Sequence, residues 1–129
     1  MEILLVDDEL EFISTLAERL HYRGIEVTYT SKPAEAVELV KNRCFQVAVL
    51  DMKMPGIGGL ELKALLQEHC PAMQFIFLTG HGSEEDYVAG KSASAFYLLK
   101  PVSIEVLVAK IKEAAACLPA NQAAPPEEP

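Results

Sequence analysis

The chain contains no tryptophan and is poor in basic residues. Only 11 lysines and arginines stand against 19 aspartates and glutamates, so the formal net charge is -8. This balance weighs against direct binding of nucleic acid, which needs clustered basic side chains, and against binding to an anionic membrane surface. The acidic surface is compatible with a protein partner, with metal binding, or with a role in solubility alone.

Cysteine is also scarce, with Cys44, Cys70 and Cys117 scattered along the chain. Their odd number and the lack of a CxxC pair argue against a disulfide framework or a zinc site and favour a reducing compartment. The amino terminus lacks the basic region and apolar stretch of a signal peptide. No apolar run approaches the length of a membrane span. We therefore expect a cytoplasmic protein.

Short apolar runs alternate with segments of helical period, and half of the 129 residues are hydrophobic, which suits one compact domain. The apolar runs predict five strands, at 3–6, 25–29, 47–50, 75–78 and 95–99. Apolar residues at three- and four-residue steps predict five helices, at about 10–22, 33–40, 60–69, 84–91 and 102–118. Ser31 is the expected N-cap of the second helix.

Nearly continuous apolar strands between helices predict an α/β fold with a parallel sheet covered on both faces. Right-handed crossovers then give a doubly wound sheet. The domain should occupy residues 1–118. The segment 119–129 contains four prolines and should be a flexible tail or a linker to an output domain.

Polar residues stand where the predicted strands end. Asp7 and Asp8 follow the first strand, and the third, fourth and fifth strands end at Asp51, Thr79 and Lys100. These ends meet at one edge of a doubly wound sheet, where ligands bind. Three carboxylates cannot all stay ionised there without compensation. A hard cation such as Mg²⁺ or Mn²⁺, together with the lysine, would supply it.

This constellation suits phosphoryl transfer to a carboxylate. A carboxylate can attack a phosphoryl group and form an aspartyl phosphate, provided that the charge on the phosphoryl oxygens is neutralised. A metal on Asp8 and Asp51, the ammonium of Lys100 and the hydroxyl of Thr79 would provide that. Taken singly, each residue has an ordinary alternative: a turn former, a helix cap, a surface lysine, or, at Pro101, a helix-opening proline. Their joint placement favours the functional interpretation.

Four motifs, in this order and near the usual spacing, carry a family resemblance. They are Leu5-Val6-Asp7-Asp8-Glu9, Leu50-Asp51-Met52-Lys53-Met54-Pro55 with Gly59, Leu78-Thr79-Gly80, and Leu99-Lys100-Pro101. Residues 2–117 closely resemble the receiver domain of bacterial two-component response regulators, the chemotaxis-regulator-like family. The resemblance implies a flavodoxin-like sheet of strand order 2-1-3-4-5 with five helices.

The resemblance also implies roles for residues at the site. Asp51 matches the phospho-acceptor. Asp7 and Asp8 match the acidic pair that holds magnesium, with Asp8 as the more direct ligand. The backbone carbonyl of Lys53 matches a further metal ligand. Lys100 matches the lysine that pairs with the phosphoryl group.

Further matches concern the conformational switch. Thr79 matches the switch hydroxyl, Tyr97 the switch aromatic, and Pro101 a proline usually preceded by a cis bond. The stretch from Thr79 to Lys100 is about one residue shorter than is usual, which leaves Phe96 as the alternative aromatic. Lys53 and His81 flank the site and are expected to tune the lifetime of the phosphoryl group.

The family's phosphodonor is a sensor histidine kinase or a histidine phosphotransfer protein. The domain would catalyse only its own phosphorylation and dephosphorylation, and would otherwise not be an enzyme. Its output would be altered packing around the fourth helix and fifth strand, read by a partner or an output domain. Homodimerisation through the fourth and fifth helices stays open.

Three competing interpretations remain. A haloacid-dehalogenase-like phosphatase would need its nucleophile on the first strand and a second aspartate two residues later, a spacing that Asp7-Asp8-Glu9 lacks. A nucleotide- or flavin-binding module would need a loop rich in glycine or hydroxyl residues after the first strand. A receiver-like docking domain would lack the acceptor or the lysine, and both are present.

Overall fold

The computed structural model describes residues 1–52, 54–79 and 96–116. A five-stranded sheet forms the centre, in the order β2-β1-β3-β4-β5. Its strands are β1 (Glu2–Val6), β2 (Glu26–Thr30), β3 (Val47–Asp51), β4 (Gln74–Thr79) and β5 (Phe96–Leu99). Each neighbouring pair is parallel. The predicted doubly wound α/β sheet and its flavodoxin-like order are confirmed.

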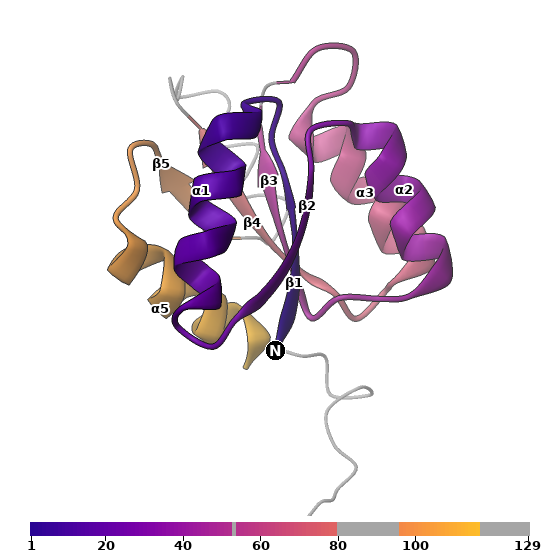
Figure 1. Ribbon diagram of the computed structural model, residues 1–129. Helices are drawn as coiled ribbons and strands as arrows, with labels where there is room; N and C mark the ends of the chain where they lie inside the picture. Colours follow the sequence, from indigo (N-terminus) through magenta and orange to yellow (C-terminus); the bar gives the residue numbers. More distant parts are fainter. Residues whose placement is uncertain (53, 80–95, 117–129) are drawn as a thin grey trace, which may run out of the picture.

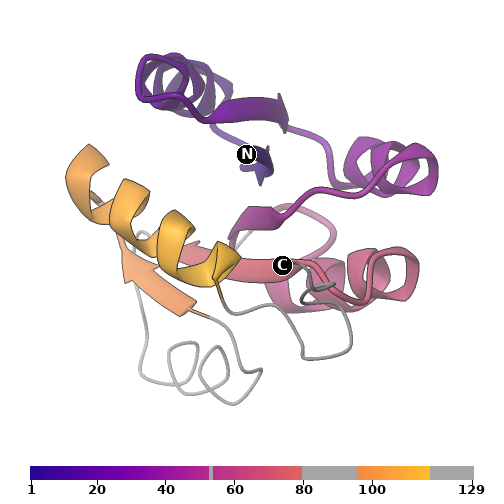
Figure 2. The ribbon, with the colours of Figure 1, turned by 90° about the horizontal axis from the view of Figure 1, so that it is seen from below.

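Four helices cover the sheet within the described residues. They are α1 (Leu10–His21), α2 (Pro33–Asn42), α3 (Gly59–His69) and α5 (Ile104–Ala115). Helices α1 and α5 lie on one face, and α2 and α3 on the other (Figures 1 and 2). The predicted helix at 84–91 and the tail at 119–129 lie outside the described residues. No helix in the described part of the chain has both the length and the apolar character needed to cross a bilayer.

The sheet separates two apolar cores, and each strand contributes to both. In β1, Leu4 and Val6 face the α2 and α3 side, whereas Ile3 and Leu5 face the α1 and α5 side. All four side chains are fully buried. Alternate side chains of a strand point to opposite faces, so a strand covered on both faces must be apolar at every position. This explains the uninterrupted apolar runs in the sequence.

The N-cap of α2 and the start of α5 differ from the prediction. Ser31 was the expected N-cap of α2, which is wrong, because Lys32 is the N-cap and Pro33 is the first helical residue. A proline suits the first helical position, and it keeps the preceding residue extended. Helix α5 begins at Ile104 rather than 102, because the Ser103 hydroxyl caps it by accepting a hydrogen bond from the Val106 backbone nitrogen at 3.1 Å.

The expectation of unpaired cysteines is corrected for two of the three. Cys44 and Cys70 form a disulfide, with their Cα atoms 5.7 Å apart. Cys44 lies just before β3, and Cys70 caps the end of α3. Helix α3 returns the chain to the level at which β3 begins, so residues separated by 26 positions meet. The spacing of cysteines in the sequence contains no sign of this encounter.

Candidate functional site

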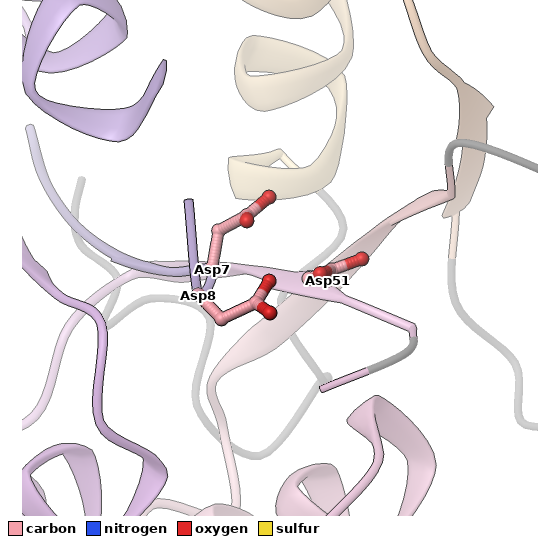
Figure 3. A group of neighbouring side chains, drawn as sticks. All are labelled: Asp7, Asp8 and Asp51. Carbon is pink, nitrogen blue, oxygen red and sulfur yellow. The ribbon is translucent and has the colours of Figure 1, made fainter. Parts of the chain in front are cut away.

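Three carboxylates converge at the edge of the sheet where the strands end, here called the carboxyl edge. Asp7 and Asp8 follow β1, and Asp51 is the last residue of β3. One carboxylate oxygen from each lies within 4.8 Å of the others. Figure 3 shows the three side chains gathered at this edge. Asp7 is fully buried and Asp51 is 6% exposed, whereas Asp8 faces solvent. The arrangement is a mostly buried acidic cluster that opens to solvent on one side.

Backbone hydrogen bonds fix the main chain at the two buried carboxylates, Asp7 and Asp51. The Asp7 nitrogen donates to the Thr30 carbonyl at 3.4 Å, which extends the β1–β2 pairing by one residue. The Met52 nitrogen donates to the Leu78 carbonyl at 2.9 Å, which extends the β3–β4 pairing past Asp51. These bonds belong to the sheet, so the site is built on a rigid element.

Gly59 allows α3 to start directly beside Asp51. Its nitrogen donates to the Met52 carbonyl at 3.0 Å. A Cβ atom at this position would lie 2.5 Å from the Asp51 carbonyl oxygen, closer than side chains tolerate. The glycine is therefore required by the close approach of the helix to the end of β3.

Lys100 brings the positive charge to the cluster. Its Nζ donates to Asp7 Oδ2 at 2.7 Å and to Glu9 Oε1 at 3.1 Å, and it lies 3.9 Å from Asp51 Oδ1. Its backbone nitrogen donates to the Thr79 carbonyl at 2.7 Å. The Lys100–Pro101 peptide bond is cis. The lysine therefore pairs most closely with Asp7, and Asp51 lies further away.

Burial and pairing act against each other at this ion pair. Burial raises the pKa of Asp7 above its ordinary value, and the hydrogen bonds from Lys100 and from the Glu9 nitrogen oppose that rise without cancelling it. Burial acts to lower the pKa of Lys100, but its hydrogen bonds to Asp7 and Glu9, together with the charges of Asp7 and Asp51, outweigh burial and raise that pKa. Lys100 is therefore firmly charged, whereas the charge on Asp7 is costly.

Two residues that hold Lys100 were not predicted. Glu9 accepts a hydrogen bond from it, and the Phe12 ring lies 4.9 Å from its Nζ in a cation–π contact. Glu9 follows the acidic pair directly, and its charge could have pointed to the site. Phe12 lies in the first turn of α1, and only the tertiary structure brings it to a residue 88 positions later along the chain (100 − 12).

The two candidate switch aromatics lie on opposite faces of β5. Tyr97 is partly buried against the core on the α2 and α3 side, beside Phe77 in the β4–β5 register. Phe96 packs against the other core, with Lys110 Nζ 5.3 Å from its ring. Thr79, at the end of β4, is 2% exposed. Lys53 and His81 lie outside the described residues.

A family model, the response regulator receiver domain, matches residues 3–112. The chain belongs to this family. Two relatives show how such domains occur in longer proteins. The transcriptional regulatory protein TrcR of Mycobacterium tuberculosis is 34% identical over 87% of this chain and 44% of its own length. The transcriptional regulatory protein GlrR of Escherichia coli is 33% identical over 87% of this chain and 26% of its own length. The receiver domain thus spans less than half of either relative.

Solved receiver structures share the fold. The CheY-like receiver domain protein from Methanospirillum hungatei has a TM-score of 0.82 and 33% identity, covering 89% of this chain and 93% of its own. A response regulator from Burkholderia pseudomallei has a TM-score of 0.80 and 30% identity, covering 89% and 68%. The latter structure contains a phosphorylated aspartic acid, a calcium ion and citrate.

The acidic cluster of this receiver domain has the donor set of a divalent metal site. All three side chains offer carboxylate oxygens, the ligands that hard cations prefer. An ion of this kind gathers oxygens at about 2.0–2.6 Å from itself, so oxygens already within 4.8 Å of one another need little rearrangement to bind it. Among the described residues of the site, the acidic side chains also outnumber Lys100, so a divalent cation would relieve their repulsion.

Proposed function

We propose that this receiver domain accepts a phosphoryl group on Asp51 in a reaction that depends on Mg²⁺ or Mn²⁺. The observation that carries the proposal is the convergence of Asp7, Asp8 and Asp51 within 4.8 Å, with Lys100 Nζ 3.9 Å from Asp51. An oxygen of Asp51 would form the new bond to phosphorus while the bond to the donor breaks. The acceptor is already an anion, so no general base is needed.

Each neighbour has a defined part in this proposal. Asp8 and Asp51, with Asp7 behind them, would hold the metal, and the family resemblance implies the Lys53 carbonyl as a further ligand. The metal would neutralise charge on the phosphoryl oxygens. Lys100 keeps its charge because of Asp7 and Glu9, and it can exchange part of that pairing for a phosphoryl oxygen. Asp7 and Glu9 therefore hold the Lys100 ammonium close to Asp51, the proposed acceptor.

Thr79 and Tyr97 are proposed as the switch. Thr79 is the last residue of β4, and its backbone carbonyl accepts a hydrogen bond from the Lys100 nitrogen. Its hydroxyl would donate to the new phosphoryl group, and the ring of Tyr97 would follow inward. The position of Tyr97 on the β4–β5 register supports this assignment over Phe96, which faces α5. The change is a population shift driven by a local charge.

The phosphodonor would be a sensor histidine kinase or a histidine phosphotransfer protein, as is usual for the family. The reader of the switch would be an output domain or a partner protein, and relatives named as transcriptional regulators support the former. A homodimer is an alternative mode of output. A kinase that draws on ATP would place the protein in the cytoplasm. The proposed domain acts only on its own acceptor and is not otherwise an enzyme.

Intact-mass analysis after incubation with acetyl phosphate tests the proposal. The parent chain should gain one phosphoryl group with Mg²⁺ and none with a chelator. Asp51→Asn should gain none, and Asp8→Asn should gain far less. Glu38→Gln removes an exposed carboxylate of α2 that pairs with Lys41, and it serves as the matched control that should behave like the parent.

Other outcomes have definite meanings. Gain in Asp51→Asn would move the acceptor elsewhere. Failure of the parent with both acetyl phosphate and a phosphorylated histidine-containing donor would leave a receiver-like docking domain. Steady release of phosphate from free phosphoesters would instead indicate a phosphatase.

A further inference from the structure

The edge of the sheet where the strands begin, here called the amino edge, carries a second reactive group. Cys44 and Cys70 meet there, with Cα atoms 5.7 Å apart, which lies within the ordinary range for a disulfide. Asp51 ends the strand that begins just after Cys44, so the pair and the acidic cluster occupy opposite edges. No step of phosphoryl transfer uses either sulfur.

The two cysteines differ in their access to solvent. Cys44 is exposed, whereas Cys70 is 2% exposed. A pocket of about 330 Å³ opens beside both residues and is otherwise lined by Phe45, Met73 and their neighbours. A small oxidant can therefore reach Cys44 from solvent, and Cys70 is placed to react with Cys44 rather than with a second protein.

The structure also provides for the reduced form. Cys44 Sγ lies 3.7 Å from the His69 carbonyl oxygen, and Cys70 Sγ lies 3.9 Å from the Val40 carbonyl oxygen. As thiols, both groups would have a carbonyl acceptor without a movement of the backbone. Each thiol would therefore have a carbonyl acceptor nearby once the disulfide is reduced.

We propose that Cys44 and Cys70 form a reversible oxidation site for hydrogen peroxide. The Cys44 thiolate attacks one peroxide oxygen, the oxygen–oxygen bond breaks, and hydroxide leaves and takes up a proton as water. The Cys70 thiolate then attacks the sulfenic acid sulfur, the sulfur–sulfur bond forms, and a second water leaves. Two thiols and one peroxide give one disulfide and two waters. A dithiol reductant reverses the change by exchange.

The disulfide closes a covalent ring around β3, the following loop and α3. A ring of this length removes conformations from the unfolded chain. Oxidation should therefore raise the melting temperature, on the order of 10 °C for a chain of this size. A reducing cytoplasm would hold the pair as thiols until peroxide appears, and the domain would then become more resistant to unfolding.

Thiol counting tests the site on the full chain. The protein is reduced, exposed to hydrogen peroxide, denatured and labelled with a maleimide for intact-mass analysis. The reduced chain should take three labels and the oxidised chain one, on Cys117, with full recovery after dithiothreitol. Cys117→Ser should still lose two labels on oxidation. Cys44→Ser should lose no label that dithiothreitol restores. A peptide map of the oxidised parent should join Cys44 to Cys70, and this arm needs no variant.

Several outcomes would overturn the proposal. One is a chain that still takes three maleimide labels after peroxide. Another is a loss of labels that dithiothreitol does not restore, and a third is a disulfide that joins two chains. Equal melting temperatures for the oxidised and reduced parent would refute the stabilising effect. Asp51→Asn should show the same thiol chemistry as the parent, so failure of phosphorylation and failure of the redox site are separate results.

Discussion

The carboxyl edge and the amino edge of the same sheet follow opposite rules. The carboxyl edge gathers Asp7, Asp8 and Asp51 around one lysine, and burial makes the charge on Asp7 costly. The amino edge buries Phe45, Cys70 and Met73 in the core on the α2 and α3 side. Substitutions that neutralise charge should relieve the first edge, whereas substitutions that remove atoms should weaken the second. Strand β3 and helix α3 span both edges, so they connect the acidic cluster at the carboxyl edge to the buried apolar residues at the amino edge.

The largest effect is expected at the amino edge. Phe45 is 3% exposed and lies under the guanidinium of Arg43, 4.6 Å from its ring centroid. Phe45→Ala should lower the free energy of unfolding by about 3 kcal/mol or more, because it leaves a cavity in the core. Denaturant melts would measure this. The fraction that remains folded should still be phosphorylated with Mg²⁺ and acetyl phosphate.

Tyr22→Ala is the matched control for Phe45→Ala. The Tyr22 side chain is 76% exposed, so its removal should change stability little. Comparable losses for the two variants would mean that burial at the amino edge does not decide stability.

The next effect is expected where α3 meets Asp51. Gly59→Ala places a Cβ 2.5 Å from the Asp51 carbonyl, and it should cost roughly 2 kcal/mol because backbone must move. Gly58→Ala meets the Met52 carbonyl at 3.2 Å and should cost much less. The rate of phosphorylation should fall for the first variant, because the end of β3 shifts. Equal losses of stability for Gly59→Ala and Gly58→Ala would contradict the close approach of α3 to Asp51.

At the carboxyl edge, a substitution should raise the free energy of unfolding rather than lower it. Asp51→Asn removes one charge from the cluster, and without metal it should raise the free energy of unfolding by about 1 kcal/mol. Added Mg²⁺ should then stabilise the parent by about 2.7 kcal/mol at a hundredfold excess over its dissociation constant, and the variant far less. Thermal melts with and without Mg²⁺ would show both changes. A destabilised metal-free variant would contradict the repulsion argument.

The smallest effect concerns pH. The pKa of Asp7 is raised in the folded chain, so its contribution to stability is present at low pH and is lost as the pH rises through that value. Asp7→Asn should therefore gain stability relative to the parent at pH 7 and lose that advantage under acid. Urea melts of the variant and the parent at pH 7 and in acid would measure this difference in stability. The other carboxylates contribute equally to both proteins, so they do not affect it. Lys100 stays charged throughout, since its pKa is raised.

The pattern of apolar runs was sufficient to predict the parallel sheet, the four helices that the described residues contain, and the edge of the sheet at which Asp7, Asp8, Asp51, Thr79 and Lys100 lie. The predicted helix at 84–91 lies outside those residues. This succeeded because parallel strands buried on both faces appear as continuous apolar runs between helices of clear period, and because their carboxyl ends must share one edge. The N-cap of α2 and the start of α5 were less accessible. They depend on the conformation of Lys32 before Pro33 and on the Ser103 cap, which a periodic signal does not resolve.

Contacts between distant segments were decided only by the tertiary structure. Lys100 pairs with Asp7 and Glu9 more closely than with Asp51, and the Phe12 ring at the start of α1 lies against its ammonium. Cys44 and Cys70 meet because α3 carries the chain back along β3 by the length of that strand. Residue types and periods determined which groups this protein has at each edge. Packing of the elements determined which of them touch, since distances between segments far apart in the chain are not written in local sequence.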